Sequence, residues 1–321
     1  MSRVDRNNPK RSQSSESTYS IMEFMREFPD DAACLDFLWR QRFSRDGEHA
    51  QCPKCKRARK FHRVRSRPSY SCDTCGHHIH PTAGTIYHRS ATSLHLWFYA
   101  SYLMTSTRCA ISAKQLEREL GVTYKTAWRM ANLIRNKLMV QDEEPLSGDV
   151  EADETFVGGK PRASRRAKYS ELSGWQRRQR AAKDAMDRKV TVFGAVERSG
   201  KVRAIVVADS SADSLQPALR RFVLPSSTIF TDEWKAYVGV GREYKRHHRI
   251  NHKQGVYVEG SVHTNTIEGF WSLVKNGIRG VYHSVSAKWL QGYLNEYAWR
   301  YNHRDDQHAM FLTLIEASAS A

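Results

Sequence analysis

The chain has 321 residues, and its 51 Lys and Arg against 34 Asp and Glu give a formal net charge of +17. Hydrophobic residues make up 40% of the chain, enough to bury a core, which excludes a wholly disordered protein. The longest apolar-leaning stretch, residues 93–104, is shorter than the roughly 20 residues of a membrane helix, and the N-terminus lacks the apolar core of a signal peptide. We therefore expect an intracellular protein whose polyanionic partner is nucleic acid rather than a membrane.

The N-terminal region is predicted to be a tail followed by helices. Residues 1–18 are rich in Ser, Asn and Arg and are expected to be disordered. Residues 19–47 are predicted to form short helices that break at Pro29. Cys34 in this region and Cys109 further along are expected to be small core residues.

Four cysteines form two C-x2-C pairs, Cys52 with Cys55 and Cys72 with Cys75, separated by sixteen residues. This spacing is typical of a zinc ribbon, in which two knuckles place four sulfur ligands around one Zn2+. Two disulfides are the alternative, but disulfides are rare inside cells. We therefore predict one structural Zn2+ in residues 48–90.

Residues 91–142 have a helical pattern. Helices over residues 112–121 and 125–137, separated by a break at Gly121, form a helix-turn-helix pattern. An ordinary helical hairpin is the alternative. In a helix-turn-helix, four residues would face a DNA major groove: Thr123, Tyr124, Lys125 and Arg129.

From residue 148 the pattern predicts an α/β region. Residues 149–157 alternate strictly between the two faces of a strand. Further strands are expected at 190–197, 201–208 and 227–230, and helices at 211–223, 263–276, 286–303 and 308–317. Three meandering strands, a helix, a further strand and then helices predict an α/β fold of the ribonuclease H type.

A basic insertion, residues 160–189, separates the first two strands of this region. It contains eleven Lys or Arg and three acidic residues, a local charge of +8. An insertion of this length in a hairpin suggests a function, and its charge favours a contact to the DNA backbone over a solvated loop. The cations that we expect to bind DNA are Arg165, Arg166, Lys168, Arg177, Arg178 and Arg180.

Three acidic residues are candidates for a metal-dependent site. Asp153 lies in the first strand, Asp232 ends the fourth, and Glu268 lies early in a helix. Phosphodiester chemistry can use two Mg2+ ions held by such carboxylates. Lys275 lies two helical turns after Glu268, where it could hold a phosphate.

Each acid also has a structural alternative. Asp153 could lie on the polar face of an edge strand, and Asp232 could cap the segment that follows it. Asn265 and Glu268 have the spacing of a capping box. The three acids therefore have to be judged together.

These residues lie in motifs that resemble those of DDE-type insertion-sequence transposases, in the bacterial group related to the eukaryotic Merlin elements. The resemblance runs from about residue 20 to residue 305. The matching motifs are the two cysteine pairs and the segments 84–86, 151–159, 231–237, 263–275 and 300–302.

The resemblance implies a ribonuclease H-like catalytic domain with two divalent ions, Mg2+ or Mn2+. Asp153, Asp232 and Glu268 would be its catalytic acids, and the 35 residues between the last two are a separation usual in this class. Asn265 is the alternative third ligand, because some relatives are described with Asn. We prefer Glu268, whose charge holds Mg2+ better and which shares a helix face with Lys275.

The resemblance also implies the reaction and the partners. A DNA transposase would bind the terminal inverted repeats of its element as a homodimer or higher oligomer, cleave the 3′ ends and join them to target DNA. It would act at the nucleoid in the bacterial cytoplasm. The alternatives are a zinc-ribbon DNA-binding regulator without catalysis and a structure-specific nuclease of the same fold.

The predicted organisation therefore has six parts. These are a disordered tail (1–18), N-terminal helices (19–47), a zinc ribbon (48–90), a helix-turn-helix region (91–142), the catalytic domain (148–305) and a C-terminal helix and tail (306–321).

Overall fold

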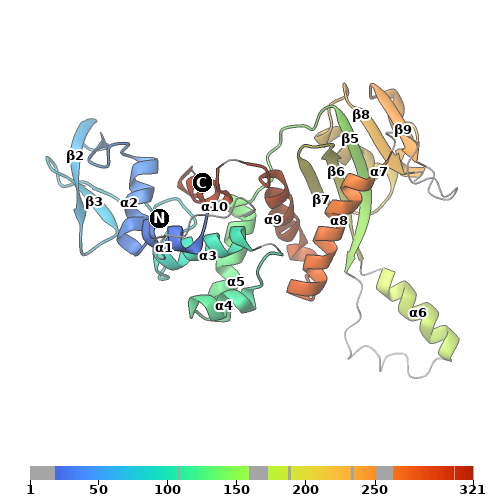
Figure 1. Ribbon diagram of the computed structural model, residues 1–321, viewed down its shortest axis with the longest axis horizontal. Coiled ribbons are helices and arrows are strands. Elements are labelled where there is room, and N and C mark those ends of the chain that lie inside the picture. The colour runs from blue at the N-terminus through green and yellow to red at the C-terminus, as the bar shows by residue number, and fades with distance from the viewer. Residues whose placement is uncertain are drawn as a thin grey trace, which may run out of the picture. The chain divides into compact units, whose positions relative to one another are not determined.

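A computed structural model describes residues 19–107, 109–158, 173–186, 189–232, 235–250, 263–306 and 308–320 (Figure 1). The predicted tail over 1–18 and the predicted DNA contacts Arg165, Arg166 and Lys168 lie outside the described residues, as does the side chain of Arg177. The chain divides into two compact units. The first comprises Met1–Arg108, Ala113–Leu138 and Asp305–Ala321, and the second comprises Cys109–Ser112 and Met139–Arg304.

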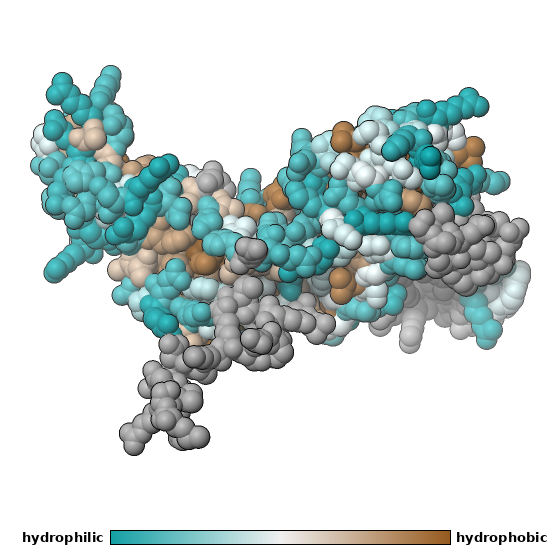
Figure 2. All heavy atoms as spheres, turned by 45° about the horizontal axis from the view of Figure 1, so that its top comes forward, coloured by the Kyte–Doolittle hydropathy of each residue, from teal (hydrophilic) through white to brown (hydrophobic). Residues whose placement is uncertain are grey.

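The polar composition of the chain is reflected in the character of its surface and of its described helices. Hydrophilic side chains cover most of the face shown in Figure 2. Within the described ranges, no helix combines the length and the apolar character needed to cross a bilayer.

The first unit begins with two helices, α1 (Ile21–Glu27) and α2 (Asp31–Arg42), and Pro29 lies between them. Ser20 and Glu23 form a capping box at the start of α1, which explains why that helix begins there. A four-stranded antiparallel sheet follows, with strands β1 (His49–Cys52), β2 (Arg57–Val64), β3 (Ser69–Cys72) and β4 (His78–Ile79). Trp39 of α2 stacks on Tyr70 of β3 with ring centres 4.2 Å apart, so the helix packs on the sheet.

Helices make up the rest of the first unit. They are α3 (Leu94–Ser106), α4 (Ala113–Leu120), α5 (Tyr124–Leu133), a π-helix over Ile134–Leu138, and α10 (Met310–Ser320). Gly121 makes the turn between α4 and α5 with a φ of +63°, a backbone conformation that favours glycine. Cys34 is buried in α2, but Cys109 is exposed outside the helices, so its prediction as a core residue is wrong.

A five-stranded mixed sheet forms the centre of the second unit. Its strands are β5 (Asp149–Gly158), β6 (Lys189–Glu197), β7 (Val202–Val206), β8 (Thr228–Asp232) and β9 (Arg246–Ile250). The spatial order is β7-β6-β5-β8-β9, where β5, β6 and β7 form an antiparallel meander and β8 and β9 run parallel to β5. β5 is therefore the central strand, which contradicts the edge-strand alternative for Asp153.

Helices cover both faces of this sheet. α7 (Ala212–Phe222) packs on one face, over a core that includes Val150, Phe193 and Ile229. α8 (Asn265–Gly277) and α9 (Leu290–Asn302) pack on the other, over Val192 and Val196. Further helical segments are α6 (Gly174–Met186), a π-helix over Ile278–Tyr282, and 3-10 turns at Lys235–Tyr237, Val240–Arg242 and Ala287–Trp289.

Candidate active site

The register of the sheet brings Asp153 and Asp232 to the same level. β5 and β8 pair in parallel, with Glu151 opposite Phe230. Two residues further along both strands, the same register places Asp153 beside Asp232, the last residue of β8. Adjacent strands lie about 4.8 Å apart, so these two carboxylates are neighbours at the carboxyl end of β8.

A buried acid, Glu151, attaches the start of α8 to β5. It is fully buried, and its Oε2 accepts hydrogen bonds from the backbone N–H of Thr266 (2.8 Å) and of Ile267 (3.1 Å). Its Oε1 accepts one from Arg198 Nε at 2.8 Å, and Arg198 Nη2 donates to the carbonyl of His263. These amides belong to the first turn of α8, which has no intrahelical acceptors for them and which favours a negative charge. Glu151 therefore fixes the helix that carries Glu268.

The three predicted acids and Lys275 line one open pocket of about 530 Å3. Glu268 lies in the first turn of α8, and its carboxylate accepts a hydrogen bond from Thr264 Oγ1 at 3.1 Å. Asn265 is exposed and is not among the residues that line this pocket. The N-cap of α8 is Thr264, which contradicts the capping-box alternative for Asn265 and Glu268. The pocket is lined by Asp153, Glu154, Thr155, Asp232, Thr264, Glu268, Trp271, Ser272, Lys275, Asn276 and Arg279.

Trp271 of α8 holds the carboxylate of Asp153. Its indole Nε1 donates to Asp153 Oδ2 at 3.0 Å. Gly194 of β6 lies directly opposite Asp153, and a Cβ atom there would come within 2.4 Å of the indole ring. The glycine therefore makes the space in which Trp271 reaches Asp153.

The pocket also contains an acid that the sequence analysis did not select. Glu154 accepts a hydrogen bond from the hydroxyl of buried Tyr237 at 3.0 Å. Burial, with the charge of Asp232, raises the pKa of Glu154 to about 7. Burial, with the charges of Glu154 and Asp232, also raises the pKa of Asp153 to about 7. A cation bound near these acids would lower both pKa values, because it would stabilise the ionised carboxylates.

The cations of the pocket come from α8 and the π-helix that follows it. Lys275 and Arg279 lie one turn apart, with Ser272 and Asn276 on the same side. Carboxylates at one end and hydrogen-bond donors at the other suit a hard metal ion beside a phosphate.

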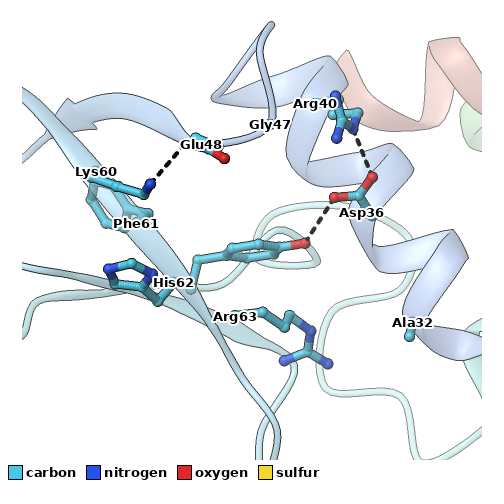
Figure 3. Close-up of a pocket in the computed structure, with 10 residues that line it drawn as sticks. Ala32, Asp36, Arg40, Gly47, Glu48, Lys60, Phe61, His62 and Arg63 are labelled. Carbon is cyan, nitrogen blue, oxygen red and sulfur yellow. Dashed lines mark hydrogen bonds and ion pairs between the residues drawn. The ribbon is translucent and has the colours of Figure 1, made fainter.

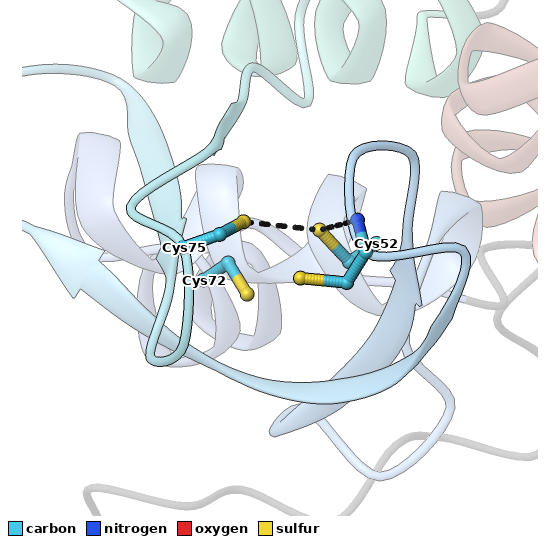
Figure 4. A group of neighbouring side chains, drawn as sticks. Cys52, Cys72 and Cys75 are labelled. Atoms are coloured by element: carbon cyan, nitrogen blue, oxygen red, sulfur yellow. Dashed lines mark hydrogen bonds between the residues drawn. The ribbon is translucent and has the colours of Figure 1, made fainter.

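The four cysteines of the two C-x2-C pairs in the first unit lie around one point (Figure 4). Their sulfur atoms all lie within 4.8 Å of one another, and in the described part of the chain this is the one group of three or more candidate ligands that is so close. Cys52 Sγ and Cys75 Sγ are 3.6 Å apart, well beyond the roughly 2.05 Å of a disulfide, and all four thiols are free. Four thiols at this spacing could hold one zinc ion.

A second hollow lies beside the sheet of the first unit (Figure 3). Its charged residues are largely paired with each other: Arg40 with Asp36 at 2.7 Å, and Lys60 with Glu48 at 2.9 Å. Tyr70 also donates to Asp36. This pairing leaves little charge for a ligand, so the hollow is a poorer candidate site than the pocket of the second unit.

The predicted DNA contacts that the structure describes all lie on the surface. Thr123 caps α5, where its Oγ1 accepts a hydrogen bond from Thr126 N–H. Tyr124, Lys125 and Arg129 are exposed along the same helix, as is Thr123. Arg178 and Arg180 are exposed on α6, which is a helix within the predicted basic insertion.

Comparisons with known proteins relate the chain to transposases. Residues 145–302, which contain the pocket, match the ISXO2-like transposase domain family. The chain is 29% identical over 254 residues to a protein in transposable element ISH50 of Halobacterium salinarum, covering 78% of this chain and 84% of that protein. It is also 29% identical over 120 residues to a transposase-like protein of Haemophilus influenzae, covering 37% of this chain and 96% of that protein. No solved structure matches the chain significantly.

Proposed function

Because the chain belongs to the insertion-sequence transposases with an ISXO2-like domain, we propose that it moves its element by cleaving and joining DNA. It binds the terminal inverted repeats, cleaves the 3′ ends of the element and transfers them to target DNA. The observation that carries this proposal is the pocket, which gathers Asp153, Asp232, Glu268 and Lys275 from two strands and a helix.

The topology of the second unit supports a catalytic domain of the ribonuclease H type. Numbered within the sheet, its strands lie in the order 3-2-1-4-5, and strand 2 is antiparallel to strand 1. The first acid lies in the middle of the central strand and the second at the carboxyl end of the neighbouring strand, so the two carboxylates are adjacent across the pair.

Each of these residues of the pocket has its own proposed role in the reaction. Asp153, Asp232 and Glu268 would together hold two Mg2+ or Mn2+ ions. The ions would supply charge neutralisation at the phosphate and a lower pKa for bound water. Lys275 binds a phosphate oxygen, while Trp271 keeps Asp153 in place.

Two displacements at phosphorus follow. In the first, a water oxygen bonds to phosphorus and the bond to the 3′ oxygen breaks, so that the 3′ oxygen takes a proton. In the second, this 3′-hydroxyl loses its proton and attacks a phosphodiester of the target, whose own 3′ oxygen leaves. The phosphoryl group stays on DNA throughout, so no Ser or Tyr nucleophile is needed.

The first unit would recognise the element's ends. The four cysteines would bind one structural Zn2+, and α4 with α5 would act as a helix-turn-helix whose exposed residues enter a major groove. Two ends must be held together for transfer, which requires a homodimer or a higher oligomer on DNA.

Two alternatives remain testable. A zinc-ribbon regulator without catalysis would not need four acids in one pocket, so the pocket counts against it. A structure-specific nuclease of the same fold would cleave without joining.

The test compares Asp232→Asn with Asp213→Asn, a matched change at an exposed acid of α7. Each protein is incubated with Mg2+ and DNA carrying the inverted repeats that flank the gene. We expect wild type and Asp213→Asn to cleave and join this DNA, and Asp232→Asn to bind it with near-normal affinity but lose cleavage by at least 100-fold. Equal behaviour of all three proteins would favour the regulator, and cleavage without joined product would favour the nuclease.

A further inference from the structure

A tryptophan in the basic insertion is unusually exposed. Trp175 has 68% of its surface exposed, the largest value among the large hydrophobic side chains that the structure describes. Exposed single apolar residues are common, but an indole is among the groups that gain most from burial or stacking. The position of Trp175 therefore calls for an explanation beyond folding.

The helix that carries Trp175 is built locally. Ser173 Oγ accepts a hydrogen bond from Gln176 N–H, and the Gln176 side chain accepts one from Ser173 N–H, a reciprocal capping box. Every side chain of α6 whose exposure is described is exposed, so the helix does not depend on burying Trp175.

The surroundings of Trp175 are cationic. Arg178 lies one turn after it, and Arg180 and Lys183 follow, all exposed. This charge matches a polyanion, whereas two copies of the same basic helix would repel each other. Cations alone would be enough for a paired duplex, whose bases are stacked and whose phosphates face outward. A large aromatic face among cations suits nucleic acid with accessible base faces.

We propose that α6 binds DNA where the two strands separate, with Trp175 stacked on an unpaired base and Arg178 and Lys183 on the adjoining phosphates. This inference rests on the proposed function, because it takes DNA as the substrate and adds that an unstacked nucleotide is part of it. The insertion starts shortly after Asp153 on β5 and returns into β6, so it connects two strands of the catalytic sheet. Separated strands are expected near a phosphodiester that must enter an active site.

The experiment uses the full-length protein and two probes of arbitrary sequence, a blunt duplex and the same duplex with a short single-stranded overhang. Arbitrary sequence is suitable because stacking on aromatic residues tolerates every base. We expect Trp175→Ala to weaken binding of the overhang probe by about 5- to 150-fold while binding of the blunt duplex changes little. Trp175→Phe keeps an aromatic face and should retain most of the affinity.

A matched charge variant separates stacking from electrostatics. Arg178→Ala should weaken binding of both probes and reduce the slope of log affinity against log salt by roughly 0.7–0.9, whereas Trp175→Ala should leave that slope unchanged. Equal loss of both probes in Trp175→Ala, or no loss of either, would overturn the proposal. A change in the mass of the DNA-free oligomer in Trp175→Ala would also overturn it, since α6 would then bind another copy of the chain.

The same samples distinguish this proposal from the proposed function. If the wild-type protein fails to cleave end-containing DNA but Trp175 still selects the overhang probe, the transposase function fails and the stacking site stands. If cleavage occurs and Trp175→Ala loses no more affinity for the overhang probe than for the blunt duplex, the function stands and the stacking site fails.

Discussion

Asp153 is a residue at which activity and stability are expected to conflict. Its pKa is about 7 instead of the ordinary 3.8, because of burial and two neighbouring acids. Between these pH values the folded state holds a proton that the unfolded state has lost. The free energy of unfolding should therefore fall as the pH rises from about 4 to about 7. Once the carboxylate is ionised, the proposed metal ions would relieve the repulsion.

We predict that Asp153→Asn stabilises the protein at pH 8 without added Mg2+, by on the order of a few kcal/mol. The amide oxygen can still accept the hydrogen bond from Trp271. Urea unfolding of both proteins at pH 5 and pH 8 measures the effect, which should be smaller at pH 5. Because Glu154 has a similar raised pKa, some pH dependence should remain. Identical unfolding curves at pH 8 would show that ionised Asp153 carries no such penalty.

The sequence predicts the acids that lie in motifs, but not the residues that hold these acids in position. Asp153, Asp232, Glu268 and Lys275 were selected from spacing and resemblance, and all four line one pocket. The role of Glu151 depends on the approach of α8, which its own strand does not reveal. The role of Gly194 likewise depends on a tryptophan that is distant in sequence.

At the scale of elements, apolar periodicity located most strands and helices but missed β9. That strand, Arg246–Ile250, contains four Arg or His residues and lies at the edge of the sheet, where it does not need two apolar faces. Helix α6 was also missed, because its side chains are mostly polar and its start depends on the Ser173–Gln176 capping box. Both misses concern elements with little buried surface, which leave a weak hydrophobic pattern.

The attachment of α8 to β5 can be tested with Glu151→Gln. We expect the variant to lose about 3–5 kcal/mol of stability, because the largely buried guanidinium of Arg198 would no longer be neutralised by a carboxylate. Cleavage should also require more Mg2+, because Glu268, a proposed metal ligand, lies in the helix that the substitution loosens. Thermal unfolding and a Mg2+ titration of cleavage measure the two effects.

The control for this change is Glu143→Gln, at an exposed ion pair with Arg221 that should contribute at most about 1 kcal/mol. If Glu151→Gln is destabilised but cleaves with an unchanged Mg2+ requirement, Glu151 supports the fold alone.

At the scale of the whole molecule, the two compact units predict separable responses to zinc. Replacing Cys72 by Ser should abolish zinc binding and unfold the small sheet of the first unit, because a structural zinc site contributes directly to folding. DNA binding should fall, while the second unit keeps its sheet and its resistance to protease. Zinc content, DNA affinity and limited proteolysis give these readouts. Loss of the second unit as well would mean that the units do not fold independently.

The position of α10 has a consequence for how the protein is made. Phe311 packs among Phe24, Phe28 and Tyr102, and Ser318 accepts a hydrogen bond from Tyr87, so a helix that follows the second unit in the chain completes the first unit. A ribosome has therefore translated the whole second unit before the first unit can close. Gene copies truncated before α10 would then yield a chain whose first unit lacks part of its aromatic core.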